Sequence, residues 1–250
     1  MGFKQEIVYS IDVEPDLHGG GEDGISEGLL RFEELCDKHN IKGTLYVVGE
    51  CIPRHSALFK RLLKKGWIIG LHGYSHKRMD DLSFKDKEKE IQKGSEIFQK
   101  HLKIKPKIFR APQHSIDEET LDLLEKYGFS IDSSYTPWNA LQLLFFPKRL
   151  NLWARSFLSP RKPYLIRERV LEVPTSALLF PFVSLLIRIM PVWALKIYVW
   201  MIKKFYPAPV FYAHSWDFVE QKGSKIDAMF PHEKFIKKLD ILIGEENKLR

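Results

Sequence analysis

The chain has 250 residues, of which 44% are hydrophobic and 28% charged, so it is long enough for one sizeable core and is not a disordered or fibrous protein. Its net charge of +7 suits an anionic substrate or surface but is lower than we expect of a dedicated nucleic-acid-binding protein, so no nucleic-acid partner is predicted. Cys36 and Cys51 are its only cysteines, which excludes a disulfide framework and favours a reducing compartment.

The chain begins almost directly with a strand, without a basic segment followed by an apolar one, so we expect a cytoplasmic protein. Periodicity, caps and stops predict strands over 6–14, 43–49, 67–73, 106–112, 129–134, 169–176 and 208–216. Helices are predicted over 26–40, 55–66, 83–102, 117–128 and 232–244. This alternation predicts a single α/β domain over residues 1–250, built as an incomplete parallel barrel or as an open doubly wound sheet. In either fold the functional groups belong at the carboxyl ends of the strands.

Two segments interrupt the alternation. Residues 136–168 are rich in proline and basic residues, have no clear period, and are predicted to be an insertion loop. Residues 177–206 are strongly apolar, but Pro181, Arg188 and Pro191 interrupt them before the ~20 apolar residues that a membrane span needs. We predict a buried pair of helices or an interface of a homo-oligomer there. Peripheral membrane contact through the tryptophans and lysines of 177–206 is the alternative.

Ionisable side chains follow the carboxyl ends of five predicted strands. Asp12 and Glu14 are two residues apart at the end of the first strand, so both point to one face. Because parallel strands of such folds converge at this rim, we expect the groups to lie together, although any one of them alone could be a structural residue. The other members of the set are His72 with His76 four residues later, Arg110, Asp132 and His214.

Two histidines and one carboxylate form a three-ligand metal site with open positions, which is typical of catalytic zinc sites. A divalent ion in such a site polarises a carbonyl group and lowers the pKa of water toward ~7. A second carboxylate can accept the proton of that water, and a histidine on the opposite side can protonate the leaving group. The residues therefore indicate metal-assisted hydrolysis of an amide or ester. One divalent ion is expected, zinc first, with cobalt, nickel or iron as alternatives.

Five segments in order resemble the motifs of the polysaccharide deacetylases, the NodB-homology group of carbohydrate esterases. The resemblance spans about residues 5–245 and rests on SIDVE, HGYSH followed by DDLS, FRAPQHSI, YGFSIDSSYTP and VFYAHSWDF. It implies a distorted (β/α) barrel of about seven parallel strands. It also implies a metal-dependent hydrolase acting on a carbon–nitrogen bond, which removes the acetyl group of an N-acetylated amino sugar.

The resemblance implies a role for each strand-end residue. Asp12 would be the general base, and His214 would be the general acid. Arg110 would orient the base through a charge-assisted contact, and Asp132 would tune a catalytic partner without touching the substrate. The metal ligands would include both histidines of the H-x3-H motif, His72 and His76.

One position departs from the family's commonest form, which has two adjacent aspartates and binds metal through the second. That second position is Val13 in this chain, and a valine cannot bind a metal ion. Glu14 lies on the same strand face as Asp12, so we assign Glu14 as the carboxylate ligand and keep Asp12 as the alternative. Asp16 and His18 are further candidates in the loop that follows.

The substrate class follows from the expected location. A cytoplasmic deacetylase would act on a free, nucleotide-linked or lipid-linked amino sugar, with Tyr74 and Trp216 either stacking on sugar or packing in the core. A hydrolase of the same fold acting on a formamide or cyclic ureide is one alternative. A non-catalytic glycan-binding protein is another. An iron oxygenase would fit the donor set, but the order of the motifs argues against it.

Overall fold

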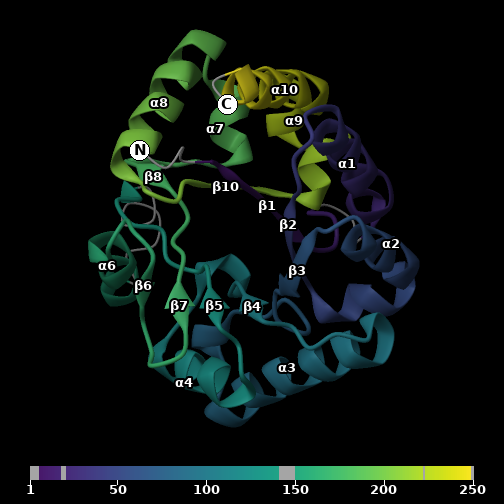
Figure 1. Ribbon diagram of the computed structural model, residues 1–250, viewed down its shortest axis with the longest axis vertical. Helices are drawn as coiled ribbons and strands as arrows, with labels where there is room; N and C mark the ends of the chain where they lie inside the picture. Colours follow the sequence, from purple (N-terminus) through teal and green to yellow (C-terminus); the bar gives the residue numbers. More distant parts are fainter. Residues whose placement is uncertain (1–5, 18–20, 141–149, 222, 249–250) are drawn as a thin grey trace.

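A computed structural model describes residues 6–17, 21–140, 150–221 and 223–248, in which eight strands form one curled sheet (Figure 1). In chain order they are β1 (Val8–Val13), β2 (Thr44–Val47), β3 (Ile68–Leu71), β4 (Ile108–Phe109), β5 (Ile131–Asp132), β6 (Tyr164–Leu165), β7 (Leu171–Glu172) and β10 (Val210–His214). The order across the sheet is β10-β1-β2-β3-β4-β5-β7-β6. All neighbours pair in parallel except β6 and β7. The predicted α/β distorted barrel of seven parallel strands is confirmed, and β6 is an additional antiparallel edge strand.

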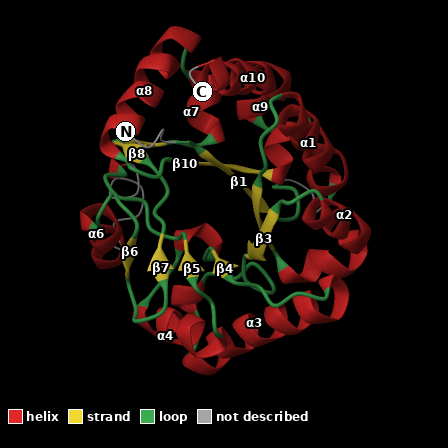
Figure 2. Ribbon diagram, viewed as in Figure 1, coloured by secondary structure: helices red, strands yellow, loops and turns green. Residues whose placement is uncertain are grey.

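Helices cover the outer face of the curled sheet (Figure 2). They are α1 (Leu29–Lys38), α2 (Ile52–Lys64), α3 (Phe84–Ile97), α4 (Glu118–Tyr127), α6 (Leu150–Leu158), α7 (Ser184–Ile189), α8 (Val192–Phe205), α9 (Lys225–Met229) and α10 (His232–Lys248). Local sequence fixes several ends: the Ser83 side chain caps α3, the Asp117 side chain caps α4, and Gly128 ends α4 with a φ of 79°. All five predicted helices are present in the described residues.

Strand alternation separates the apolar core from the polar interior of the barrel. Ile11 and Val13 of β1 are fully buried and belong to the core that also contains Leu29 of α1. Ser10 and Asp12 point to the opposite face, inside the barrel, where polar side chains meet. The pairing of β1 with β10 places Asp12 beside His214.

The segment 136–168 is more ordered than a loop. It contains α6 and β6, so the prediction of an insertion loop without regular structure is wrong for these residues; residues 141–149 lie outside the described part. The nine-residue helix α6 buries Trp153 against the rest of the domain. A helix of little more than two turns gives too few repeats for its period to stand out in the sequence.

The segment 177–206 closes the barrel between β7 and β10. It forms a small hairpin of β8 (Ala177–Leu178) and β9 (Phe180–Pro181), followed by α7 and α8. Backbone hydrogen bonds join Ser176 to Val210 (3.1 Å) and Tyr212 to Phe182 (3.2 Å). The two helices are present, but α8 buries only the face of Leu195, Tyr198, Val199 and Ile202, so whether its other face is an interface stays a prediction. Among the described residues, no helix is both long enough and apolar enough to traverse a bilayer.

Candidate active site

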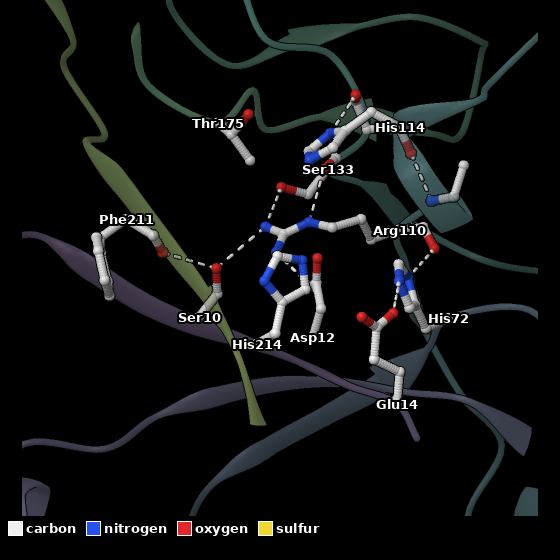
Figure 3. Close-up of polar contacts among 12 residues, drawn as sticks. Ser10, Asp12, Glu14, His72, Arg110, His114, Ser133, Thr175, Phe211 and His214 are labelled. Carbon is white, nitrogen blue, oxygen red and sulfur yellow. Dashed lines mark hydrogen bonds and ion pairs between the residues drawn. The ribbon is translucent and has the colours of Figure 1, made fainter. Parts of the chain in front are cut away.

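The strand-end side chains meet at one rim of the barrel, at the carboxyl ends of the parallel strands. Figure 3 shows Asp12 of β1 and His214 of β10 pointing toward Glu14, His72 and Arg110, which directly follow β1, β3 and β4. All except His214 are buried, and His214 is partly exposed. The expected convergence of these residues is therefore present in the structure.

Glu14, His72 and His76 form a cluster of metal-ligand type. The Oε2 atom of Glu14 lies 2.5 Å from Nε2 of His76 and 3.9 Å from Nε2 of His72. One ligand atom from each residue lies within 4.8 Å of the other two. The His76 side chain is 27% exposed, whereas those of Glu14 and His72 are nearly closed off, so the cluster opens to solvent on the His76 side.

The donor set fits a divalent transition metal. Nδ1 of His72 lies 2.8 Å from the carbonyl oxygen of Arg110, and donation of the Nδ1 proton to this oxygen leaves the Nε2 lone pair facing Glu14. Burial lowers the pKa of His72 to about 4, so its imidazole is neutral. Burial opposes the charge of Glu14, but the hydrogen bond with His76 and the charge of His214 lower the pKa of Glu14 to about 2. A neutral imidazole and an ionised carboxylate are the forms that bind metal.

A tight turn brings His76 back toward the end of β3. Gly73 has a φ of 70° and His76 a φ of 58°, a left-handed conformation that is costly for a histidine. Glu90 of α3 holds this turn: its carboxylate accepts hydrogen bonds from the backbone N–H groups of Tyr74 (2.9 Å) and Ser75 (2.8 Å) and from the Ser75 hydroxyl (2.7 Å). Sequence reasoning missed Glu90, because a glutamate within a charged helix carries no signal of its partners.

We expect Glu90→Ala to weaken metal binding about 10- to 100-fold, since two backbone donors lose their acceptor and the His76 turn loses its support. The metal dissociation constant, measured by competition with a chelator, checks this. Glu96→Ala on the same helix removes an exposed carboxylate that bonds to Gln92, and it is the matched control. Unchanged affinity in Glu90→Ala would show that the turn holds its shape without the carboxylate.

Asp12 and Arg110 form a buried ion pair beside the cluster. Nη1 of Arg110 donates to Oδ1 of Asp12 over 2.7 Å. The guanidinium also donates to the carbonyl oxygen of Ser133 and lies 4.1 Å from the ring centre of Tyr46. Burial by itself would raise the pKa of Asp12, but the charge of Arg110, with His72 and His214 nearby, holds that pKa well below its usual range. Asp12 is therefore ionised and fixed in position.

His214 is held by Asp217 and Trp216. Oδ2 of Asp217 lies 3.3 Å from Nδ1 of His214 and accepts a hydrogen bond from the backbone N–H of His214 (2.9 Å). The imidazole stacks on the Trp216 indole at a centroid distance of 4.4 Å, and the indole N–H donates to Oε1 of Glu14 (2.8 Å). Burial disfavours the charged imidazole, but Asp217 and Glu14 raise the pKa of His214 to about 9. His214 is therefore a proton donor near neutral pH.

The segment 177–206 supports this histidine from behind. Arg188 of α7 is buried, and its guanidinium donates to the carbonyl oxygen of Asp217 (2.8 Å) and lies 3.5 Å from Oδ1 of the same residue. It also donates to Oδ1 of Asp227 (2.7 Å). Arg188 was noted in the sequence only as a charge that interrupts an apolar run. The structure places it behind the carboxylate partner of His214.

Asp217→Asn is expected to move the alkaline limb of the pH profile to lower pH. The pKa of folded His214, about 9, lies above the ordinary value of 6.5, so the stabilisation from its charge is complete below about pH 6.5 and is lost as the pH rises to 9. Removing the negative charge lowers this pKa toward 6.5, so activity that needs protonated His214 is lost at lower pH. The profile of kcat/KM between pH 6 and 10 measures the shift, and an unmoved limb would contradict the assignment of His214.

Asp132 makes its contacts within a second buried group of polar side chains. Its carboxylate accepts a hydrogen bond from the Ser134 hydroxyl (2.6 Å) and pairs with the carboxyl group of Glu172, which is also buried. Burial and the adjacent charge of Asp132 raise the pKa of Glu172 well above its usual range, so this pair shares a proton. Asp217, rather than Asp132, is the carboxylate beside His214. The role of Asp132 in tuning a catalytic partner stays a prediction.

The other carboxylate candidate, Asp16, serves the loop and not the metal cluster. It accepts hydrogen bonds from the backbone N–H groups of Asp23 and Gly24, both over 2.9 Å. His18 lies outside the described residues. Glu14 is thus the carboxylate that the structure places against both histidines.

Comparison with known sequences gives an independent result. The family described as polysaccharide deacetylase matches residues 22–131, which include both histidines of the cluster and Arg110. A peptidoglycan-N-acetylglucosamine deacetylase of Bacillus cereus is 27% identical over 128 residues, which are 51% of this chain and 43% of the relative. The chain spans about half the length of the curated relatives it matches.

Solved structures share the fold. A candidate polysaccharide deacetylase from Mycobacterium smegmatis superposes with a TM-score of 0.68 at 18% identity, covering 96% of this chain and 85% of that one. A CE4 family pseudoenzyme from Bacillus anthracis gives a TM-score of 0.55 at 14% identity, over 100% and 63% of the two chains. These likenesses show the fold alone. The sequence match over residues 22–131, and not the likeness of the folds, places this part of the chain in the polysaccharide deacetylase family.

Proposed function

We propose that the protein is a metal-dependent hydrolase that removes the acetyl group from an N-acetylated amino sugar. One observation carries the proposal: an ionised carboxylate, Asp12, and a protonated imidazole, His214, lie on neighbouring strands beside the Glu14–His72–His76 cluster. Two titratable groups whose surroundings drive their charge states apart are the pattern of a general base and a general acid.

The chain's own residues divide the proposed reaction between them. Asp12 accepts a proton from the water that attacks the acetyl carbonyl, and Arg110 keeps the carboxylate ionised and aimed. His214 donates its proton to the amine nitrogen as the carbon–nitrogen bond breaks, so acetate and the free amino sugar leave. Asp217 and Trp216 keep the imidazole in place during this transfer. Glu14, His72 and His76 would hold the metal, which supplies Lewis acidity when bound.

The test is release of primary amine and acetate from a panel of acetamido sugars by the metal-loaded protein. We expect turnover of at least one of them, loss of turnover on chelation, and recovery with zinc, cobalt, nickel or ferrous ion; the most active of these identifies the preferred metal. Formylated sugars and cyclic ureides in the same panel test the alternative carbon–nitrogen bonds. Hydrolysis of the ureides alone would overturn the proposed acetyl specificity.

A non-catalytic outcome is measurable in the same preparation, because a pseudoenzyme of this fold exists. Sugar binding detected by calorimetry, with no amine released under any metal, would replace the proposed hydrolase by a glycan-binding protein. The cytoplasmic location, the oligomeric state and a contact of 177–206 with membranes stay predictions. A membrane contact would depend on three exposed side chains of α8, those of Trp193, Ile197 and Trp200.

A further inference from the structure

An apolar groove of about 310 Å³ begins at the candidate general acid. His214 and Trp216 line it, and the Trp216 indole N–H also donates to Oε1 of Glu14 in the metal cluster, so the groove adjoins the candidate active site. Its walls come from β9, the start of α7, β10 and α9. The carbon-rich lining consists of Pro181, Val183, Leu185, Tyr212 and Ile226. A volume of this size is in the range of small-molecule sites in proteins.

The mouth of the groove exposes large aliphatic side chains to water. Leu17 is 59% exposed, Ile226 45% and Leu185 39%, and all three line the groove. They come from three separate parts of the chain: the loop after β1, helix α9 and helix α7. Apolar side chains that are exposed singly over a surface need no ligand to explain them. These three line one cavity that leads to a catalytic group, which indicates an apolar ligand.

The charged residues of the wall are already paired with one another. Arg188 bonds to Asp227 and to the backbone of Asp217, and Asp217 in turn holds His214. The side-chain amide of Gln221 donates to the carbonyl oxygen of Trp216 (3.0 Å). A sugar ring placed in the groove would give up hydrogen bonds to water and meet mainly carbon, which is unfavourable for each unpaired hydroxyl. A hydrocarbon chain has no such cost and gains from burial.

We propose that this groove binds a hydrocarbon chain attached to the amino sugar, so that the substrate is a lipid-linked N-acetylated amino sugar. The inference rests on the proposed function, since it places the sugar at His214 and Glu14 and the chain in the adjoining groove. It names the substrate class that the site chemistry alone leaves open.

The test uses methyl, butyl and octyl glycosides of N-acetylglucosamine, below their micelle concentrations, with the zinc-loaded full chain. We expect kcat/KM to rise at least tenfold from methyl to octyl, since every methylene buried in the groove adds affinity. Leu185→Asp and Ile226→Asp should each reduce this octyl-to-methyl ratio to less than threefold. Ile241→Asp, at a 42% exposed position on the remote helix α10, should keep the full ratio.

Binding of octyl β-glucoside, which has no acetyl group, separates the two proposals. Suppose that calorimetry detects binding of octyl β-glucoside and that Leu185→Asp abolishes this binding. The groove assignment then stands even when no glycoside is hydrolysed, and only the proposed function fails. If the acetylated glycosides are hydrolysed with a flat octyl-to-methyl ratio, the deacetylase stands and the groove assignment fails. An octyl gain that survives in Leu185→Asp and Ile226→Asp equally would also overturn it.

Discussion

Asp12→Asn is expected to lower kcat by about 10²- to 10⁴-fold, the usual contribution of a general base. Asparagine has nearly the same shape and can still accept the hydrogen bond from Arg110, but it cannot accept a proton from water. The effect should therefore appear in kcat, with a small change in KM. Steady-state kinetics on the best acetamido sugar of the panel measures both constants.

The matched control for this substitution is Asp16→Asn. Asp16 is four residues away, its carboxylate accepts two backbone hydrogen bonds in the loop, and asparagine can keep one of them. We expect its kcat to stay within about threefold of the wild type, since it touches no reacting group. If Asp12→Asn retained more than a third of the wild-type kcat with the metal bound, another group would have to be the base.

Arg110→Met should cost about 3–5 kcal/mol of stability, because it leaves the buried Asp12 carboxylate without its ion-pair partner. Arg110 is fully buried and donates hydrogen bonds to Asp12, Ser10 and Ser133, so its loss leaves three buried groups without their donor. At about 2–4 °C per kcal/mol for a chain of this size, the melting temperature should fall by about 6–20 °C. Thermal unfolding followed by circular dichroism measures the change.

Arg54→Met is the control, because it removes an arginine ion pair that is exposed and not buried. Arg54 pairs with Glu22 at the surface, and its side chain is 56% exposed, so we expect a cost of about 0–1 kcal/mol. The double variant Asp12→Asn with Arg110→Met should be more stable than the sum of the single effects predicts, since the charge that Arg110 compensates is gone. Additive effects, or a melting temperature of Arg110→Met equal to that of Arg54→Met, would contradict a coupled buried pair.

The parts of the fold that local sequence determines could be predicted. Strands such as 43–49 and 67–73 carry runs of apolar residues, and helices such as 117–128 carry their own cap and stop. The strand ends then had to share one rim, which is why Glu14, His72 and His76 were expected together before any distance was known. Val13, pointing into the apolar core, left Glu14 as the residue facing the histidines.

Partners that come from distant parts of the chain could not be predicted. Glu90 and Arg188 act through contacts that depend on how α3 and α7 pack, and no local pattern records such packing. Asp217 did have a local signal, because an acidic residue three positions after His214 can cap the turn that follows a strand. Asp132 was expected behind a catalytic partner, and the structure pairs its carboxylate with that of Glu172, from a strand that pairs with its own.

We propose that Glu14, His72 and His76 hold one catalytic metal ion. It is tested most directly by the metal content of the purified protein, measured by mass spectrometry after loading and desalting, for the wild type, Glu14→Ala, His76→Ala and the control Asp16→Asn. We expect about one equivalent of a divalent transition metal in the wild type and the control, and loss of the metal in both other variants. Metal retained in Glu14→Ala, or none bound by the loaded wild type, would contradict it.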